Sequence, residues 1–271
     1  MIKAYMASIN NSKAFVSAIV PVFNEEKTVK SVVKRLVKHP LINEVICVND
    51  GSQDKSLKIL KLFKKEIKLI NLRRNHGKGH ALAEGVKKAA GEIVAFFDAD
   101  LTNLSLNHID SLLDPLIKNQ ARAVLGYPTG GHFPYLFKNV TGERAYYRKD
   151  LLKHLEMISK TTRFSTEYYL NSIFEEHEIK KLPLYKLIHL YKHEKYKPQQ
   201  AIKETLRDML TITHQIGKEE GLLPNDFQFI KKFIVNVRNA NTLKELKEKI
   251  NEINNRNVKK YLKRVFIYFY Q

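Results

Sequence analysis

The feature that most constrains the fold of this chain is an apolar run that ends in two acids, within residues 92–101. Ile93 to Phe97 are all apolar, and Asp98 and Asp100 follow with a single residue between them. An unbroken apolar run of this length is typical of a strand buried on both faces of a parallel sheet. Side chains two residues apart on an extended chain point to the same side. We therefore expect both carboxylates at the carboxyl end of a buried strand, where open α/β sheets bind ligands.

Two carboxylates in that position suit a divalent cation. Mg²⁺ and Mn²⁺ prefer oxygen ligands and keep part of their coordination shell for other partners, such as substrate phosphates. The alternative is a surface turn after a strand, because Asp is common in turns. Asp98-Ala99-Asp100 alone leaves both interpretations open, and the segments before it favour the metal site.

The residues before these acids alternate between strand-like and helix-like segments. Four strands are expected, over residues 15–22, 45–48, 67–72 and 93–97. The connections between them are short and carry apolar residues at helical spacing, a pattern that predicts right-handed βαβ units and a parallel sheet. Each strand is followed by a polar cluster, and all four clusters would meet at one edge of the sheet. We expect Asn24 and Asp54 to cap the first two helices.

The pattern continues less regularly after residue 101. The sequence predicts a helix over 106–118, a strand over 121–126, a helix over 164–177 and a strand over 181–191. Residues 127–140 are rich in Gly, Pro and aromatic residues and indicate a loop over the site, and residues 141–144 are expected to open a further helical stretch. From residue 199 onward the apolar spacing is helical throughout. These patterns divide the chain into a main domain over 1–198 and a helical C-terminal extension over 199–271.

The composition limits the compartment and the partners. Cys47 is the only cysteine, which excludes an internal disulfide and fits a reducing compartment. Residues 1–14 lack the apolar core of a signal peptide, and no apolar run is long enough to span a membrane. We therefore expect a cytoplasmic protein, with peripheral contact to the membrane face left open. The net charge of +19 predicts anionic partners, which include phosphorylated substrates, an anionic membrane surface and nucleic acid.

The four strand-end motifs stand at residues 21–26, 49–54, 75–81 and 98–101, with the sequences Pro-Val-Phe-Asn-Glu-Glu, Asn-Asp-Gly-Ser-Gln-Asp, Asn-His-Gly-Lys-Gly-His-Ala and Asp-Ala-Asp-Leu. In this order they resemble the nucleotide-binding half of family 2 glycosyltransferases with the GT-A fold. Residues 142–145, Gly-Glu-Arg-Ala, and a Glu at 167 resemble the branch that contains dolichyl-phosphate mannosyltransferases and glucosyl-3-phosphoglycerate synthases. The resemblance implies an α/β fold with a Rossmann-like, mixed but mainly parallel sheet flanked by helices. It does not extend to the helical C-terminal extension.

The resemblance also implies a site for a nucleotide-sugar donor. Pro21, Phe23 and Glu25 would line the pocket for the base and ribose, and Asp50 would accept a hydrogen bond from the base. Uracil N3–H and guanine N1–H are both donors, so a carboxylate suits either. Lys78, between two glycines, would approach the diphosphate, although the Walker pattern is absent. The alternatives are an ordinary turn at Asp50, a helix start at residues 24–26 and a solvated lysine at the start of a helix.

By the same resemblance, Asp98 and Asp100 hold Mg²⁺ or Mn²⁺. Asp100 would act catalytically through the ion, which neutralises charge on the departing nucleoside diphosphate. A third ligand is expected from a late histidine, and we favour His189 over His193 because of its spacing from the preceding strand. The alternative is a histidine that is simply packed in the fold.

Arg144 and Glu167 are implied to face the acceptor. Arg144 would grip a phosphate or carboxylate, with a structural ion pair as the alternative. Glu167 would orient a sugar hydroxyl or act as the general base of an inverting enzyme. The lysines of residues 180–197 suit a phosphate-bearing acceptor, but also a solvated basic face. Residues 259–270 fit an amphipathic helix on a membrane surface, but we favour packing on the core or a seam in a homodimer.

We therefore predict a metal-dependent glycosyltransferase that moves a hexose from a UDP- or GDP-sugar to a phosphorylated small molecule or a polyprenyl phosphate. One rival is a nucleotidyltransferase, which usually has a Gly-rich, Arg-containing loop after the first strand; residues 24–26, Asn-Glu-Glu, stand there instead. The other is a non-catalytic basic module for nucleic acid or anionic membrane, whose binding would weaken steeply with salt. Such a module gives no reason for four strand-end motifs, so nucleic acid is not an expected partner.

Overall fold

The computed structural model describes residues 14–130, 138–217, 221–237 and 243–270, and its centre is a seven-stranded sheet in the order β3-β2-β1-β4-β6-β5-β7. The strands are β1 Val16–Val22, β2 Glu44–Asp50, β3 Lys68–Leu72, β4 Ile93–Phe96, β5 Ala123–Pro128, β6 Glu143–Tyr147 and β7 Ile179–Leu184. β1 to β4 pair in parallel, as the strand–helix alternation predicts, and β6 runs antiparallel to both of its neighbours. The expected mixed, mainly parallel sheet of the GT-A fold is confirmed.

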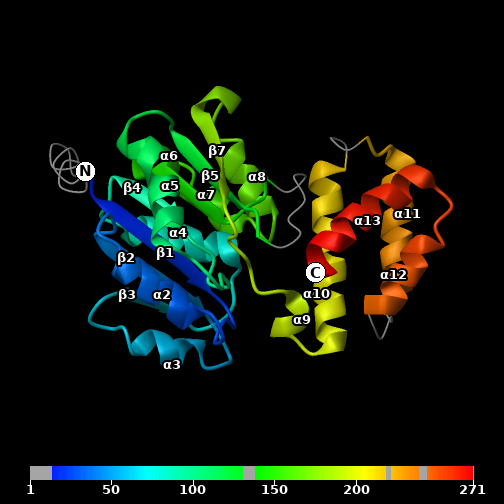
Figure 1. Cartoon of the computed structure of the whole chain (residues 1–271), viewed down its shortest axis with the longest axis horizontal. Coiled ribbons are helices and arrows are strands. Elements are labelled where there is room, and N and C mark those ends of the chain that lie inside the picture. The colour runs from blue at the N-terminus through cyan, green and yellow to red at the C-terminus, as the bar shows by residue number, and fades with distance from the viewer. Residues whose placement is uncertain (1–13, 131–137, 218–220, 238–242, 271) are drawn as a thin grey trace.

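Helices cover both faces of the sheet (Figure 1). They are α2 Val29–Val37, α3 Ser56–Lys61, α4 Lys78–Lys88, α5 Leu106–Ile117, α6 Arg148–Leu152, α7 Leu155–Lys160 and α8 Ser165–Asn171. α2, α3 and α5 pack on one face, where Val20 and Cys47 point. α4, α6, α7 and α8 pack on the other, where Ile19 and Val48 point. Neighbouring residues enter opposite cores because side chains alternate along a strand.

β4 is buried on both faces, as its unbroken apolar run predicts. Ile93 and Ala95 belong to one core, and Val94 and Phe96 to the other. The strand lies between β1 and β6 near the middle of the sheet. Asp98 and Asp100, which follow β4, therefore lie at the middle of the sheet's carboxyl edge and not at one of its outer strands.

The expectation that residues 141–144 open a helical stretch is wrong. Glu143–Tyr147 is strand β6, and the next helix begins only at Arg148. Ala145 and Tyr146 are fully buried, and they pack in the cores on opposite faces of the sheet, as neighbouring residues of a central strand do. Aromatic residues favour such a pleated, buried surface over a short helix. β6 also inserts between β4 and β5, which brings Arg144 opposite Phe96.

Three smaller expectations also fail. Asn24 does not cap a helix: it has a positive φ of 57°, and its side-chain Oδ1 accepts a hydrogen bond from the Gln53 N–H at 2.8 Å, so α2 begins at Val29 with Thr28 as its N-cap. The helix over 164–177 is shorter, as α8 ends at Asn171. The strand expected to reach residue 191 ends at Leu184. Asp54 does accept a hydrogen bond from the Ser56 N–H at 2.9 Å, at the start of α3, although Lys55 is the N-cap of that helix.

The C-terminal extension is helical, as its apolar spacing predicts. It contains α10 Pro198–Ile216, α11 Pro224–Val237, α12 Leu243–Asn251 and α13 Arg256–Tyr270, after the short α9 Lys192–Lys195. Their apolar faces form a core of their own, and α13 buries Val258, Leu262 and Val265 in it. This confirms packing on a core for residues 259–266, the part of the 259–270 segment whose side chains the structure describes. In Figure 1, α10 stands between the sheet and helices α11 and α12, and α13 crosses over α10. The domain division at residue 198 stays a prediction.

Membrane crossing by a helix is a separate matter. Within the part of the chain that the structure describes, no helix combines the length and apolar character that a bilayer span requires. Residues 131–137, in the middle of the predicted loop over 127–140, lie outside the described residues.

Candidate active site

A cavity of about 260 Å³ lies at the carboxyl edge of the sheet, against α8 and α10. Its lining joins residues that are far apart in the sequence. The polar part of the lining includes Lys78, Asp98, Asp100, Glu167, His189 and Lys195. The predicted convergence of strand-end side chains thus produces a real concave site.

Lys78 lies between two carboxylates at one end of this site. Its Nζ is 2.7 Å from Asp98 Oδ1 and 2.8 Å from Glu167 Oε1. Burial alone would lower the pKa of Lys78, but the two carboxylates raise it above its usual range. Burial raises the pKa of Asp98. Gly142 packs directly against Asp98, and a Cβ on this glycine would lie 2.0 Å from Asp98 Oδ2.

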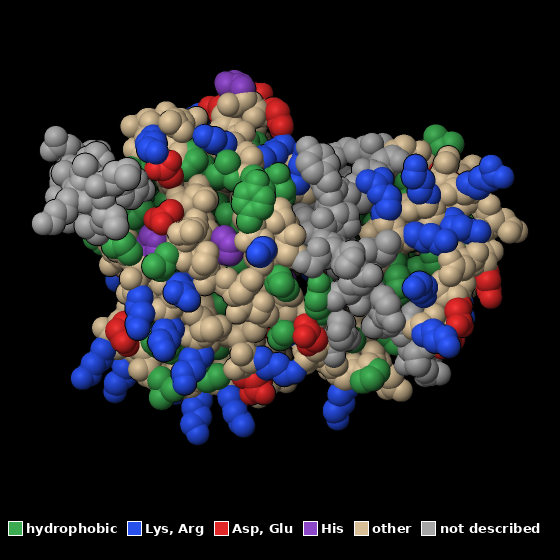
Figure 2. All heavy atoms as spheres, viewed as in Figure 1, with side chains coloured by type: hydrophobic (Ala, Val, Ile, Leu, Met, Phe, Trp, Pro, Cys, Tyr) green, Lys and Arg blue, Asp and Glu red, His purple; other side chains and the backbone are tan. Residues whose placement is uncertain are grey.

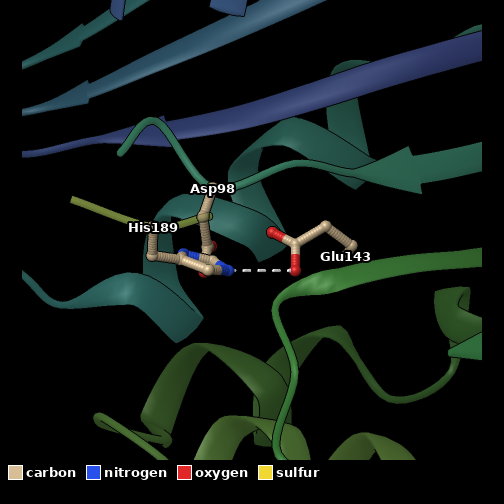
Figure 3. Close-up of side chains that lie close together, drawn as sticks. All are labelled: Asp98, Glu143 and His189. Carbon is tan, nitrogen blue, oxygen red and sulfur yellow. Dashed lines mark ion pairs between the residues drawn. The ribbon is translucent and has the colours of Figure 1, made fainter. Parts of the chain in front are cut away.

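His189 bridges two further carboxylates through its two ring nitrogens. Nδ1 lies 2.9 Å from Asp100 Oδ1, and Nε2 lies 3.3 Å from Glu143 Oε2. Figure 3 shows the imidazole edge facing Glu143, with the carboxylate of Asp98 beside it. Burial would lower the pKa of His189, but Glu143 and Asp100 raise it well above its usual range. Ligand atoms of Asp98, Glu143 and His189 all lie within 4.8 Å of one another, a spacing that could hold a metal ion.

The backbone explains how His189 reaches this position without being part of β7. Leu101 and His189 form an isolated antiparallel bridge, and the Leu190 N–H donates to the Asp100 carbonyl oxygen at 2.8 Å. The segment after β7 therefore crosses back over the carboxyl end of β4. His193 lies in a stretch whose side-chain surroundings are outside the described residues.

Lys195 closes the other end of the site. Its Nζ lies 2.6 Å from Asp100 Oδ2 and 2.8 Å from Glu25 Oε1. Burial would raise the pKa of Asp100, but Lys195 and His189 hold it well below its usual range. Burial, with Asp100 nearby, raises the pKa of Glu25 to about 7.

The site has more negative than positive groups. Five carboxylates meet there, against two lysines and one histidine: Glu25, Asp98, Asp100, Glu143 and Glu167, against Lys78, Lys195 and His189. Two buried oxygens, Glu143 Oε1 and Glu167 Oε2, have no hydrogen-bond partner within the described part of the chain. Buried polar atoms are normally paired, and buried charge without a partner is costly. The donor set therefore suits an additional cation bound among these oxygens.

The residues expected around the base are spread more widely. Asp50 is buried, and its two oxygens accept hydrogen bonds from the backbone N–H groups of His76 and Gly77, both at 2.8 Å. It thereby holds the loop that leads to Lys78. Of the other expected residues, Phe23 is 37% exposed, and Glu25 lines a second cavity of about 280 Å³ beside the first. Neither Pro21 nor Phe23 nor Asp50 lines either cavity.

The structure does not bring Arg144 to the cavity. The side chain is only 1% exposed, and its guanidinium donates to the carbonyl oxygens of Thr141 and Asn139, at 2.6 and 2.8 Å, and to Asn171 Oδ1 at 2.6 Å. These bonds tie β6, the segment before it and α8 together. The geometry favours a structural role, through hydrogen bonds and not through the ion pair that the sequence suggested as the alternative.

Two residues of the site were not singled out by the sequence. Glu143 stands inside a motif that carries the family resemblance, but only the pairing of β6 beside β4 places it against His189. Lys195 belongs to a basic run in which nothing distinguishes one lysine from the next. A tertiary contact was needed to find either one.

Comparison with known proteins agrees with this architecture. Residues 17–173 match the family model described as glycosyl transferase family 2. An uncharacterised glycosyltransferase of Synechocystis sp. is 42% identical over 92 residues, which cover 31% of this chain and 29% of that protein. Dodecaprenyl-phosphate galacturonate synthase of Rhizobium johnstonii is 28% identical over 176 residues, 55% of this chain and 52% of that protein. The chain thus spans about half or less of the length of these curated relatives.

Solved structures share the fold at low sequence identity. Glucosyl-3-phosphoglycerate synthase of Mycobacterium tuberculosis, in complex with Mn²⁺, UDP-glucose and phosphoglyceric acid, superposes with a TM-score of 0.60 at 20% identity. The match covers 80% of this chain and 84% of the other. At this identity, the likeness establishes the architecture of the chain and not its substrates.

Proposed function

Because the chain belongs to glycosyl transferase family 2, we propose that it is a glycosyltransferase that moves a hexose from a UDP- or GDP-linked donor with the help of Mg²⁺ or Mn²⁺. The observation that carries the proposal is a cluster of five carboxylates from different parts of the chain at the carboxyl edge of the sheet, three of which, Asp98, Asp100 and Glu167, line one cavity. Ligands bind at this edge in open α/β sheets.

We assign the metal to Asp98, Asp100 and His189. All three line the cavity, where a substrate oxygen can share the ion, whereas Glu143 is fully buried behind them. A histidine that binds a metal through one nitrogen usually gives its other N–H to a carboxylate, which holds the ring in place. Glu143 is placed to be that carboxylate. When bound, the ion would supply a Lewis acid that neutralises charge on the departing nucleoside diphosphate.

The residues of the chain itself would position the donor and acceptor. Lys78 holds Asp98 and Glu167 at a fixed separation through its two short ion pairs. Glu167 lines the cavity, and its buried Oε2 has no hydrogen-bond partner among the described residues. We infer that the Glu167 carboxylate accepts a hydrogen bond from an acceptor hydroxyl or takes its proton, as a general base must lie within hydrogen-bond reach of the proton it removes.

The acceptor would enter from the side of the cavity that is apolar. Val140, Phe164, Leu190 and Tyr191 form this side, and Arg163 lies beside it, ion-paired with Asp208 and Glu204. An apolar wall of this kind suits an acceptor with a hydrocarbon part. We therefore favour a polyprenyl phosphate, the acceptor that the name of the Rhizobium relative indicates for that protein, over a small phosphorylated acid such as phosphoglyceric acid.

A lipid acceptor would require the protein to reach a membrane surface. Figure 2 shows Lys and Arg side chains gathered over α2 and α3. Exposed members of this basic face are Lys30, Lys34, Arg35, Lys38, Lys55, Lys58, Lys61, Lys64 and Lys65. Basic residues near an anionic leaflet each add attraction that salt weakens. We propose peripheral contact through this face, tested by sedimentation with vesicles that contain or lack anionic lipid.

A panel of nucleotides tests the proposed function. UDP or GDP should raise the melting temperature only when Mn²⁺ or Mg²⁺ is present, because a ligand that binds the folded state stabilises it by mass action. Incubation with UDP- and GDP-hexoses and a short-chain polyprenyl phosphate should then release nucleoside diphosphate, and EDTA should abolish the release. No metal-dependent shift, together with tight salt-sensitive binding to RNA, would instead favour a non-catalytic basic module.

A further inference from the structure

One ion-pair bridge separates the two cavities at the edge of the sheet. Lys195 and Leu190 line both the cavity of about 260 Å³ that holds the carboxylate cluster and the neighbouring cavity of about 280 Å³. The ammonium of Lys195 reaches Asp100 on one side, at 2.6 Å, and Glu25 on the other, at 2.8 Å. The partition is therefore built from a side chain of α9 held by acids that follow β1 and β4.

The bridge engages the carboxylate that the proposed metal needs. Asp100 has one oxygen on His189 and the other on Lys195, so positively charged partners already occupy both. The Lys195 side chain is only 11% exposed, and at that burial two cations near one carboxylate repel each other strongly. A divalent ion at Asp100 and the ammonium of Lys195 would therefore compete for the same group.

We propose that Lys195 is a displaceable donor-binding residue: its ammonium is held by Asp100 and Glu25 until a divalent ion takes over Asp100, and it then pairs with the diphosphate of the nucleotide donor. This rests on the proposed function. A diphosphate that shares the ion with Asp100 lies within reach of a lysine that contacts the same carboxylate. The flexible four-carbon stem allows the ammonium to move while the backbone stays in place.

Movement of Lys195 would also open part of the wall between the two cavities, which it shares with Leu190. The second cavity is lined mainly by polar residues that follow β1 and β2: Asn24, Glu25, Glu26, Gln53 and Asp54. These residues belong to the motifs over 21–26 and 49–54, whose resemblance to family 2 glycosyltransferases implies a nucleoside site. A donor that spans both cavities would need the partition open. Lys195 would thus couple entry of the nucleoside to arrival of the metal.

The test compares Lys195→Met with wild type in two binding measurements. In a calorimetric titration with Mn²⁺ alone, the dissociation constant for Mn²⁺ should be at least about threefold lower for the variant than for wild type, because the competing ammonium is gone. Titration with UDP and with GDP at saturating Mn²⁺ should give a dissociation constant about tenfold higher, as for the loss of one charge-assisted hydrogen bond. General damage to the site would weaken both.

Two further variants complete the test. Lys195→Arg keeps the charge and should bind the nucleotide within about threefold of wild type, and it gives a result even where Lys195→Met does not fold. Lys197→Met removes an exposed lysine two residues away and should match wild type in both titrations. Unchanged nucleotide affinity in Lys195→Met, or weaker binding of both ligands, would overturn the proposal for Lys195. If wild type itself binds neither UDP nor GDP with Mn²⁺, the proposed function fails.

Discussion

Gly142→Ala offers the sharpest test of the carboxylate cluster, because a single added carbon would collide with Asp98. The new Cβ would lie 2.0 Å from Asp98 Oδ2 and 2.4 Å from Cγ, whereas ordinary contact begins near 3.4 Å. The carboxylate must withdraw by about 1.4 Å, the difference between 3.4 and 2.0 Å. The Asp98 side chain is 22% exposed, so it can yield toward the cavity, away from its position against Lys78.

The size of the effect follows from that displacement. A shift of about 1 Å in a group that positions a reaction costs about 10²-fold in rate. Overpacking of a tight contact costs about 1–3 kcal/mol of stability. We therefore expect Gly142→Ala to fold with a modestly lower melting temperature, to lose about 100-fold in kcat/KM for release of the nucleoside diphosphate, and to bind Mn²⁺ more weakly.

Gly221→Ala is the matched control. This glycine has a φ of +78°, and apart from its chain neighbours no atom of the described residues lies within 4 Å of the added carbon, so the substitution strains the backbone without touching the site. It should cost about 1–2 kcal/mol of stability and leave kcat/KM unchanged. A Gly142→Ala enzyme with kcat/KM within about threefold of wild type would refute the inference that the position of Asp98 matters for the reaction.

Three further outcomes are expected. Glu143→Gln should weaken Mn²⁺ binding by about 10–100-fold in calorimetry, because His189 loses the carboxylate that holds its ring; unchanged affinity would remove Glu143 from the site. Arg144→Met should lower the free energy of unfolding in urea by about 3 kcal/mol or more, since three oxygens lose their buried donor. If that variant lost activity but kept its stability, the role in acceptor binding that the sequence implied for Arg144 would be supported instead. The pKa of Glu25 is about 7 in the folded chain, against an ordinary value of 4.5. Between these two pH values the folded chain therefore binds one proton more than the unfolded chain. The stability that Glu25 contributes is present below pH 4.5 and is lost as the pH rises through 7. Without metal, the unfolding free energy of wild type should therefore fall by about 2 kcal/mol relative to Glu25→Gln between pH 4.5 and 7.5; a constant difference would show that this carboxyl titrates normally.

Local patterns were enough to predict most of the sheet. Strands β1 to β4 and the helices between them follow from apolar runs at two spacings, and the strands expected over 121–126 and 181–191 overlap β5 and β7. The same alternation predicts that the polar clusters after β1 to β4 meet at one edge. Lys78, Asp98 and Asp100, from the clusters after β3 and β4, line one cavity there, and Lys195 links Glu25, after β1, to Asp100.

Strand β6 was not predictable in the same way. Residues 141–147 are too few to show a period, and what makes them a strand is the slot between β4 and β5. Asn24 stands where a helix cap is expected, but a hydrogen bond to the neighbouring loop holds its backbone at a positive φ. In both places a partner distant in the sequence overrides the local preference.

The sequence alone determined which chemical groups this protein brings together, since periodicity and strand-end motifs specify the parallel half of the sheet and the acids at its edge. Only the tertiary structure decided how those groups are paired. Glu143 contacts His189 because β6 enters the sheet antiparallel, and Lys195 contacts Asp100 because the chain returns over β4. The guanidinium of Arg144 donates its hydrogen bonds inside the fold. The reason is physical: burial and pairing of charge depend on distances between segments, which local residue patterns do not contain.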